Sequence, residues 1–167
     1  MDSILLIAIS CILILIFFQD VMQREVYWFL FPIAFALCGV YFSQMLPLIQ
    51  LLAHFGVNLL IIGVLIVIVM AYLYLRFRDT KILLWNYLGL GDVLFFGVVG
   101  ICFSPLNFVL FTIVSLLLSL LFSVVFMKRN TTVPLAGFQA ICLQITLIAQ
   151  LTTSFNPFNE YWIYQWI

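Results

Sequence analysis

Two aspartates, Asp20 and Asp92, are the residues of this chain whose type and position could do chemistry. Each stands at the end of a long apolar stretch, and Asp92 completes the tetrad Gly89-Leu90-Gly91-Asp92. Acidic side chains are costly beside membrane-type segments and usually serve a function there. Two carboxylates held close together share one proton, so that one can act as a general base and the other as a general acid.

Such a pair can hydrolyse a peptide bond with an activated water and without a covalent intermediate, a cofactor or a metal ion. The ionised carboxylate takes a proton from the water, the water attacks the peptide carbonyl, and the protonated carboxyl polarises the carbonyl oxygen. We expect Gly89 and Gly91 to support this chemistry, because glycine lets an extended peptide approach the backbone beside Asp92 and permits dihedral angles that other residues avoid.

A structural role is the alternative interpretation of both acids. Asp92 could satisfy free amides at the start of a helix, since aspartate is a favoured N-cap residue. Asp20 could be a solvated loop residue near Arg24.

The composition indicates a membrane protein with several spans. Of the 167 residues, 67% are hydrophobic and 7% are charged, and six basic residues balance six acidic ones. This composition predicts an all-helical protein in the lipid bilayer. No basic run is present for a nucleic acid to bind.

Apolar length and the positions of charges and prolines predict a bundle of six transmembrane helices in a single membrane-embedded domain, residues 1–167. A span needs about 20 apolar residues. The fourth predicted span is short and requires either a start inside the tetrad or shielding by its neighbours. The six predicted spans cover residues 1–18, 26–43, 55–75, 93–103, 106–127 and 133–151.

The basic residues predict the orientation of this bundle. All six fall in alternate segments between the predicted spans, and basic segments usually face the cytoplasm. Both termini are therefore predicted on the non-cytoplasmic side, and both aspartates at the cytoplasmic ends of their helices. The basic residues are Arg24, then Arg76, Arg78 and Lys81, then Lys128 and Arg129.

Several other residues are interpreted as structural. Ser115, Ser119 and Ser123 recur every fourth residue and align small side chains for close helix packing. His54 is expected near the outer interface as a solvated or capping residue. The C-terminal residues 155–167 are interpreted either as a segment on the outer interface or as a frayed tail. The four cysteines are expected to be buried, unreactive thiols; they are Cys11, Cys38, Cys102 and Cys142.

Three segments, in order along the chain, resemble the motifs of the type IV prepilin peptidases, a family of membrane aspartic peptidases with a GxGD motif. They are residues 19–26 with the Phe31-Pro32 pair, residues 89–93, and residues 133–140, which hold Pro134 and Gly137 and are similar to the sequence that opens the family's last helix.

The resemblance implies an aspartic endopeptidase that removes the leader peptide of prepilin-like proteins, each with a single membrane helix, at the cytoplasmic face of a bacterial inner membrane. Asp20 and Asp92 match the family's catalytic pair, and Gly89, Gly91, Pro134 and Gly137 match the positions that support it. The chain has no room for the domain that larger members use for N-methylation, so no methyltransferase activity is expected.

Two other functions remain open from the sequence. Positions that flank the motifs differ from the family pattern, as at Val26-Tyr27 and Leu94, which leaves an inactive scaffold of a pilus or secretion assembly as one alternative. A small proton- or ion-coupled carrier that uses the same acids is the other.

Overall fold

The computed structural model of the chain describes residues 2–77, 89–126, 134–153 and 155–160. All regular secondary structure in these residues is helical, which confirms the predicted all-helical class. The six helices are α1 (Asp2–Met22), α2 (Leu30–Phe42), α3 (Leu48–Phe77), α4 (Leu90–Cys102), α5 (Pro105–Phe126) and α6 (Leu135–Thr152).

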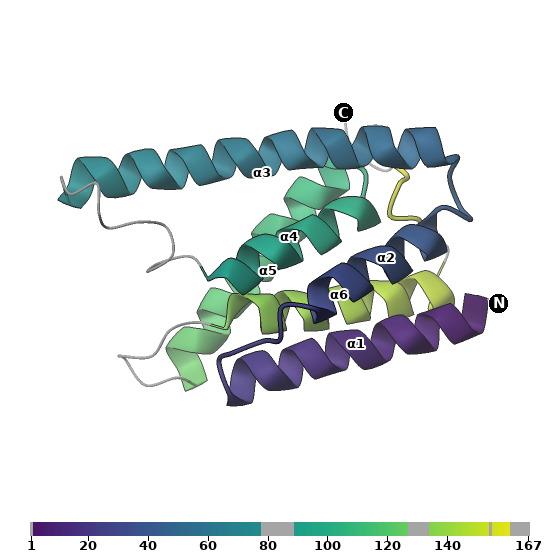
Figure 1. The fold of residues 1–167 in the computed structure, drawn as a ribbon, viewed down its shortest axis with the longest axis horizontal. Helices are drawn as coiled ribbons and strands as arrows, with labels where there is room; N and C mark the ends of the chain where they lie inside the picture. The colour runs from purple at the N-terminus through teal and green to yellow at the C-terminus, as the bar shows by residue number, and fades with distance from the viewer. Residues whose placement is uncertain (1, 78–88, 127–133, 154, 161–167) are drawn as a thin grey trace.

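Successive helices run in alternate directions along the bundle (Figure 1). Helix α4 lies at its centre and packs against α2, α3, α5 and α6, while α1 packs mainly against α6 and α2. The inward face of α4 is buried through Phe95, Val98 and Val99. This packing brings the end of α1 and the starts of α4 and α6 to the same end of the bundle.

Four of the helices are long and apolar enough to cross a membrane: α1, α3, α5 and α6. Helices α2 and α4 have 13 residues each, which gives each a length of about 20 Å against a hydrocarbon thickness of about 30 Å. The chain therefore has the length and composition of a helical membrane protein.

Helix α1 is longer than predicted, and Asp20 lies inside its last turn rather than after it. The helix ends where Arg24 takes a left-handed conformation, with φ at 58°, and its N–H donates to the carbonyl of Asp20 at 3.2 Å. This is a common way for a helix to end, although glycine is the usual residue at such a position. The predicted span is short because hydropathy falls after Phe18, whereas the helix continues for another turn.

The predicted boundaries of the next helices also need correction. Helix α2 begins at Leu30 rather than at residue 26 and has Pro32 in its first turn, where the missing N–H costs no hydrogen bond. Helix α3 has 30 residues and begins immediately after Pro47, seven residues before the predicted start. Helix α4 starts at Leu90, inside the tetrad, which is one of the two conditions that the short fourth span required.

A buried asparagine on α3 holds the other end of α4. Asn58 is fully buried, and its side-chain Nδ2 donates to the carbonyls of Gly100 at 2.7 Å and Phe103 at 2.9 Å. Carbonyls at a helix end have no intrahelical donor, so this side chain satisfies groups that lipid could not.

Residues 155–160 form a segment, here called the C-terminal strap, that closes this same end of the bundle. The carbonyl of Pro157 accepts hydrogen bonds from the N–H of Ser104 at 3.2 Å and from Nδ2 of Asn107 at 2.8 Å. Phe158 packs edge to face on Phe42 of α2. The frayed-tail interpretation is therefore wrong for residues 155–160, while residues 161–167 lie outside the described part of the chain.

The serines on α5 are buried to different extents. Ser115 and Ser119 are fully buried, and Ser123 is half-buried. Among the cysteines, Cys38 and Cys102 are buried, Cys142 is half-buried, and Cys11 is exposed, so the expectation of burial is wrong for Cys11.

Replacing Asn58 should test the contact between α3 and α4. We expect Asn58→Ala to lower the free energy of unfolding by about 1–2 kcal/mol, because two carbonyls lose their donor. Leu60→Ala is the control, since Leu60 lies on the same helix and is 72% exposed. Thermal unfolding in detergent measures both variants, and an equal effect of the two would contradict the structural role of Asn58.

Candidate active site

The start of α6 provides two adjacent free amides. Pro134 is the N-cap residue and Leu135 the first helical residue. The amides of the following residues, Ala136 and Gly137, have no carbonyl four residues earlier within the helix to bind. They are available for acceptors from other parts of the chain.

Each aspartate accepts a hydrogen bond from one of these two amides. The N–H of Ala136 donates to Oδ1 of Asp92 at 2.9 Å, and the N–H of Gly137 donates to Oδ2 of Asp20 at 2.6 Å. Two carboxylates that are far apart in sequence, on α4 and α1, are thus held by consecutive amides of a third helix. Because these amides are adjacent, both carboxylates lie at the start of α6.

The helix dipole at the start of α6 favours negative charge on the two acids. The N-terminus of α6 carries a partial positive charge that favours anions by about 0.3–1 kcal/mol each, and up to about 2 kcal/mol where the site is partly buried. Asp20 lies in the last turn of α1, where its own helix disfavours a negative charge. The amide of Gly137 and the positive charge of Arg24, which interacts with Asp20, both act against that effect.

Asp92 is also part of the start of its own helix. It is the third residue of α4, and its Oδ2 accepts a hydrogen bond at 3.2 Å from the N–H of Gly89, the N-cap residue. The capping interpretation is thus correct in part, although Asp92 is not itself the N-cap. The two oxygens of Asp92 are bound by the starts of two different helices, which fixes the orientation of its carboxylate.

The glycines of the motifs allow close approach. A Cβ at Gly137 would lie 3.1 Å from both the Cβ and Oδ2 of Asp20, and one at Gly89 would lie 3.2 Å from Oδ2 of Asp92. A Cβ at Gly91 would lie 3.3 Å from the ring of Phe31 on α2.

No described glycine has a positive φ, so the expected need for unusual dihedral angles is wrong. Gly137 is buried, and its N–H is the donor to the carboxylate of Asp20.

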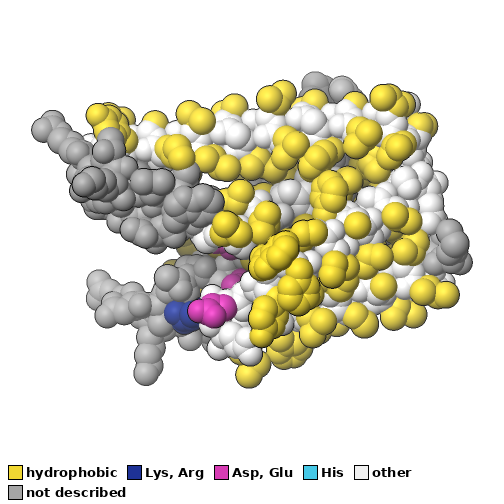
Figure 2. Space-filling view, in the orientation of Figure 1, with side chains coloured by type: hydrophobic (Ala, Val, Ile, Leu, Met, Phe, Trp, Pro, Cys, Tyr) yellow, Lys and Arg dark blue, Asp and Glu magenta, His cyan; other side chains and the backbone are white. Residues whose placement is uncertain are grey.

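The acid pair keeps capacity for a further ligand. Asp20 uses one oxygen for Gly137, and within the described segments its Oδ1 accepts no hydrogen bond. Both aspartates are half-buried. On the face drawn in Figure 2, acidic and basic side chains gather at one end of the molecule, and the flanks of the helices are apolar.

Other polar residues lie apart from the pair or were not anticipated. His54 lies in the second turn of α3. The start of α3 is at the opposite end of the bundle from the start of α4 (Figure 1). Gln139 is buried one turn after Ala136, and neither atom of its amide finds a partner among the described residues. A single glutamine in an apolar run gave no sequence signal. The described side chains contain no group of three or more His, Cys, Asp or Glu residues that could hold a metal ion.

Comparison of the chain with models of known protein families, with curated proteins and with solved structures finds no match in any of the three. The function of the acid pair therefore rests on its own geometry and on the sequence motifs.

An alanine at position 137 should disturb the acid pair. We expect Gly137→Ala to lower the free energy of unfolding by about 1–3 kcal/mol, because the new Cβ displaces Asp20 from the end of α6. Gly97→Ala is the matched control, because a Cβ at Gly97 meets nothing within 4 Å. At position 97 the higher helix propensity of alanine should raise the free energy of unfolding by up to about 1 kcal/mol. Thermal unfolding in detergent that gave both variants the same sign of change would contradict the packing described.

Proposed function

We propose that this chain is a membrane aspartic endopeptidase in which Asp20 and Asp92 activate a water molecule. The observation that carries the proposal is the binding of both carboxylates by the consecutive amides of Ala136 and Gly137. A solvated loop residue would not need a buried helix terminus, and a helix-capping residue would not need a second acid beside it.

In the proposed mechanism the two carboxylates share one proton and titrate as a pair. The ionised member accepts a proton from the water, the water attacks the peptide carbonyl, and the protonated member donates to the carbonyl oxygen. The amides of α6 hold the carboxylates in place, so that little reorganisation accompanies the reaction.

The proposed substrates are prepilin-like proteins with a single membrane helix, cleaved next to that helix at the cytoplasmic face. Three features support this choice: the acids lie at helix ends, the surrounding helices are apolar, and the motifs at residues 19–26, 89–93 and 133–140 resemble those of the prepilin peptidases. The proposed enzyme cleaves its substrate without N-methylating the product, and it resides in a bacterial inner membrane.

This function requires six crossings with both termini outside the cytoplasm. Helices α2 and α4 are shorter than the hydrocarbon layer is thick. Helix α4, however, is in contact with four other helices, and non-helical backbone at membrane depth is tolerated where protein covers it. The basic residue Arg24 follows α1 at the same end as the acids, as a cytoplasmic location requires.

Conservative changes of the two acids should abolish cleavage. Asparagine keeps an oxygen for the amides of Ala136 and Gly137 but can neither take nor supply the proton. We expect Asp20→Asn and Asp92→Asn each to slow cleavage of a prepilin-like peptide by a factor of about 10²–10⁴. The purified protein in detergent and the fluorescence of a quenched leader peptide provide the measurement.

Glu25→Gln is the control for the loss of a negative charge, since Glu25 is exposed and follows α1, the helix of Asp20. Cleavage by both aspartate variants at the rate of the unaltered protein would contradict the proposal. An inactive protein that still binds the peptide would indicate the scaffold, and an ion flux in liposomes that depends on both acids would indicate the carrier.

The orientation can be tested separately. We expect a reporter enzyme that is active only outside the cytoplasm to be active when fused after Ile167, and inactive when inserted after Glu25, because positively charged segments stay in the cytoplasm. The opposite pattern of activity would contradict the proposed topology and place the acids on the wrong side for a cytoplasmic leader.

A further inference from the structure

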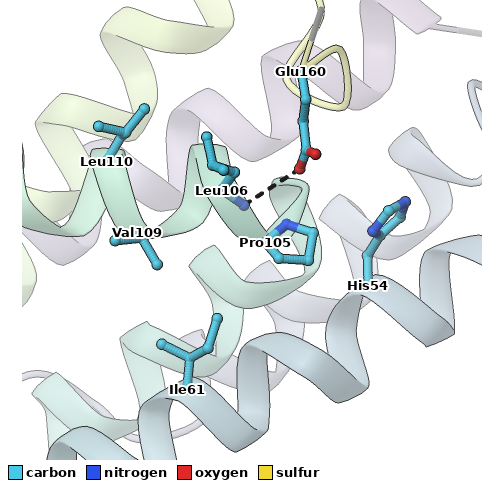
Figure 3. A pocket seen from close by; sticks show the side chains of 7 residues that line it. All are labelled: His54, Ile61, Pro105, Leu106, Val109, Leu110 and Glu160. Carbon is cyan, nitrogen blue, oxygen red and sulfur yellow. Dashed lines mark hydrogen bonds between the residues drawn. The ribbon is translucent and has the colours of Figure 1, made fainter. Parts of the chain in front are cut away.

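A groove lies between α3, α5 and the C-terminal strap, at the end of the bundle away from the acids. Its volume is about 550 Å³, within the usual range for ligand sites. Figure 3 shows its two kinds of lining: the polar side chains His54 and Glu160 at one side, and an apolar wall that includes Ile61, Val109 and Leu110.

The polar part of the groove is held in place by the strap. The N–H of Leu106 donates to Oε1 of Glu160 at 3.3 Å, as the dashed line in Figure 3 shows. Nδ2 of Asn107 donates to the carbonyl of Asn159 at 3.1 Å. The ring of His54 packs against Phe158, with ring centroids 6.0 Å apart. Both polar groups are therefore fixed before a ligand arrives, which favours binding.

The apolar part of the groove follows the two helices into the membrane. Its walls belong to Leu48–Tyr72 and Pro105–Val125, which are both long and apolar enough to span a bilayer. His54 and Ile61 are separated by two turns of α3, which corresponds to about 10 Å along the helix. A ligand that fits both parts is amphiphilic, with its polar group at the helix ends and its chain along the helices.

The charges identify the polar group. Glu160 uses Oε1 for Leu106, and within the described part of the chain its Oε2 has no donor. A carboxylate accepts hydrogen bonds and attracts a cation, while the N–H of an imidazole donates to an oxyanion. An acceptor and a donor that line the same groove match a headgroup with an ammonium and a phosphate.

We propose that this groove binds a phospholipid with a primary-amine headgroup, namely phosphatidylethanolamine. Its ammonium donates to Glu160, its phosphate accepts from the imidazole of His54, and one acyl chain lies along Ile61, Val109 and Leu110. A choline headgroup has no N–H to donate, and a glycerol headgroup leaves the lipid with a net negative charge beside Glu160. This lipid site is independent of the proposed peptidase activity.

Native mass spectrometry of the intact protein in detergent tests the proposal. The probes are the dioleoyl forms of phosphatidylethanolamine, phosphatidylcholine and phosphatidylglycerol, each at the same concentration. We expect the ethanolamine lipid to bind about tenfold more tightly than the other two, because only this lipid donates a charge-assisted hydrogen bond to Glu160. Glu160→Gln keeps an oxygen for the Leu106 amide and should remove this preference.

Two further variants separate loss of the site from loss of the fold. Val109→Phe should fill the apolar wall and weaken binding of all three lipids, whereas Leu120→Phe, 59% exposed on the same helix, should not. Glu25→Gln controls for loss of a negative charge elsewhere. Equal affinity for the three lipids, or an unchanged preference in Glu160→Gln, would overturn the proposal.

Discussion

The binding of two carboxylates by the first free amides of α6 is the interaction on which the acidic end of this protein depends. Asp20 is unfavourable at the end of its own helix, and Asp92 adds a second negative charge beside it. The N-terminus of α6 favours this arrangement, because its amides and its dipole both attract anions. The absence of a Cβ at Gly137 lets α1 approach closely enough for the contact to form.

The opposite end of the bundle has a different physical basis. There, neutral side chains bind backbone carbonyls: Asn58 caps α4, and Asn107 fastens the strap to the start of α5. These bonds satisfy polar backbone groups that lipid could not. The contacts that hold α3, α4 and α5 together at this end are therefore separate from the two acids. This separation would suit the proposed reaction, in which the acids change protonation state.

The sequence predicts the helical class and six helices, because apolar length and charge position are local properties. It places the start of the fourth helix at residue 93, however, and a start inside the tetrad is only one of two conditions for so short a span. It also identifies the two acids that the structure brings together. The partners of these acids could not be predicted, because nothing local shows which helix terminus reaches them. Hydropathy also misplaced helix ends: Gln19 and Asp20 are polar but helical, whereas Tyr27 to Phe29 are aromatic but precede α2. The fold of the strap depends on bonds to Ser104 and Asn107 that leave no pattern in the strap itself.

The central claim is that Asp20 and Asp92 form one coupled acid pair at the end of α6. Its most direct test is a pH titration of the aspartate carboxyl carbons by ¹³C NMR in detergent micelles. The account predicts that the signals of both residues follow the same two steps, and that Asp20→Asn reduces the titration of Asp92 to a single step. Independent single-step titrations, unchanged by replacement of the other acid, would contradict it.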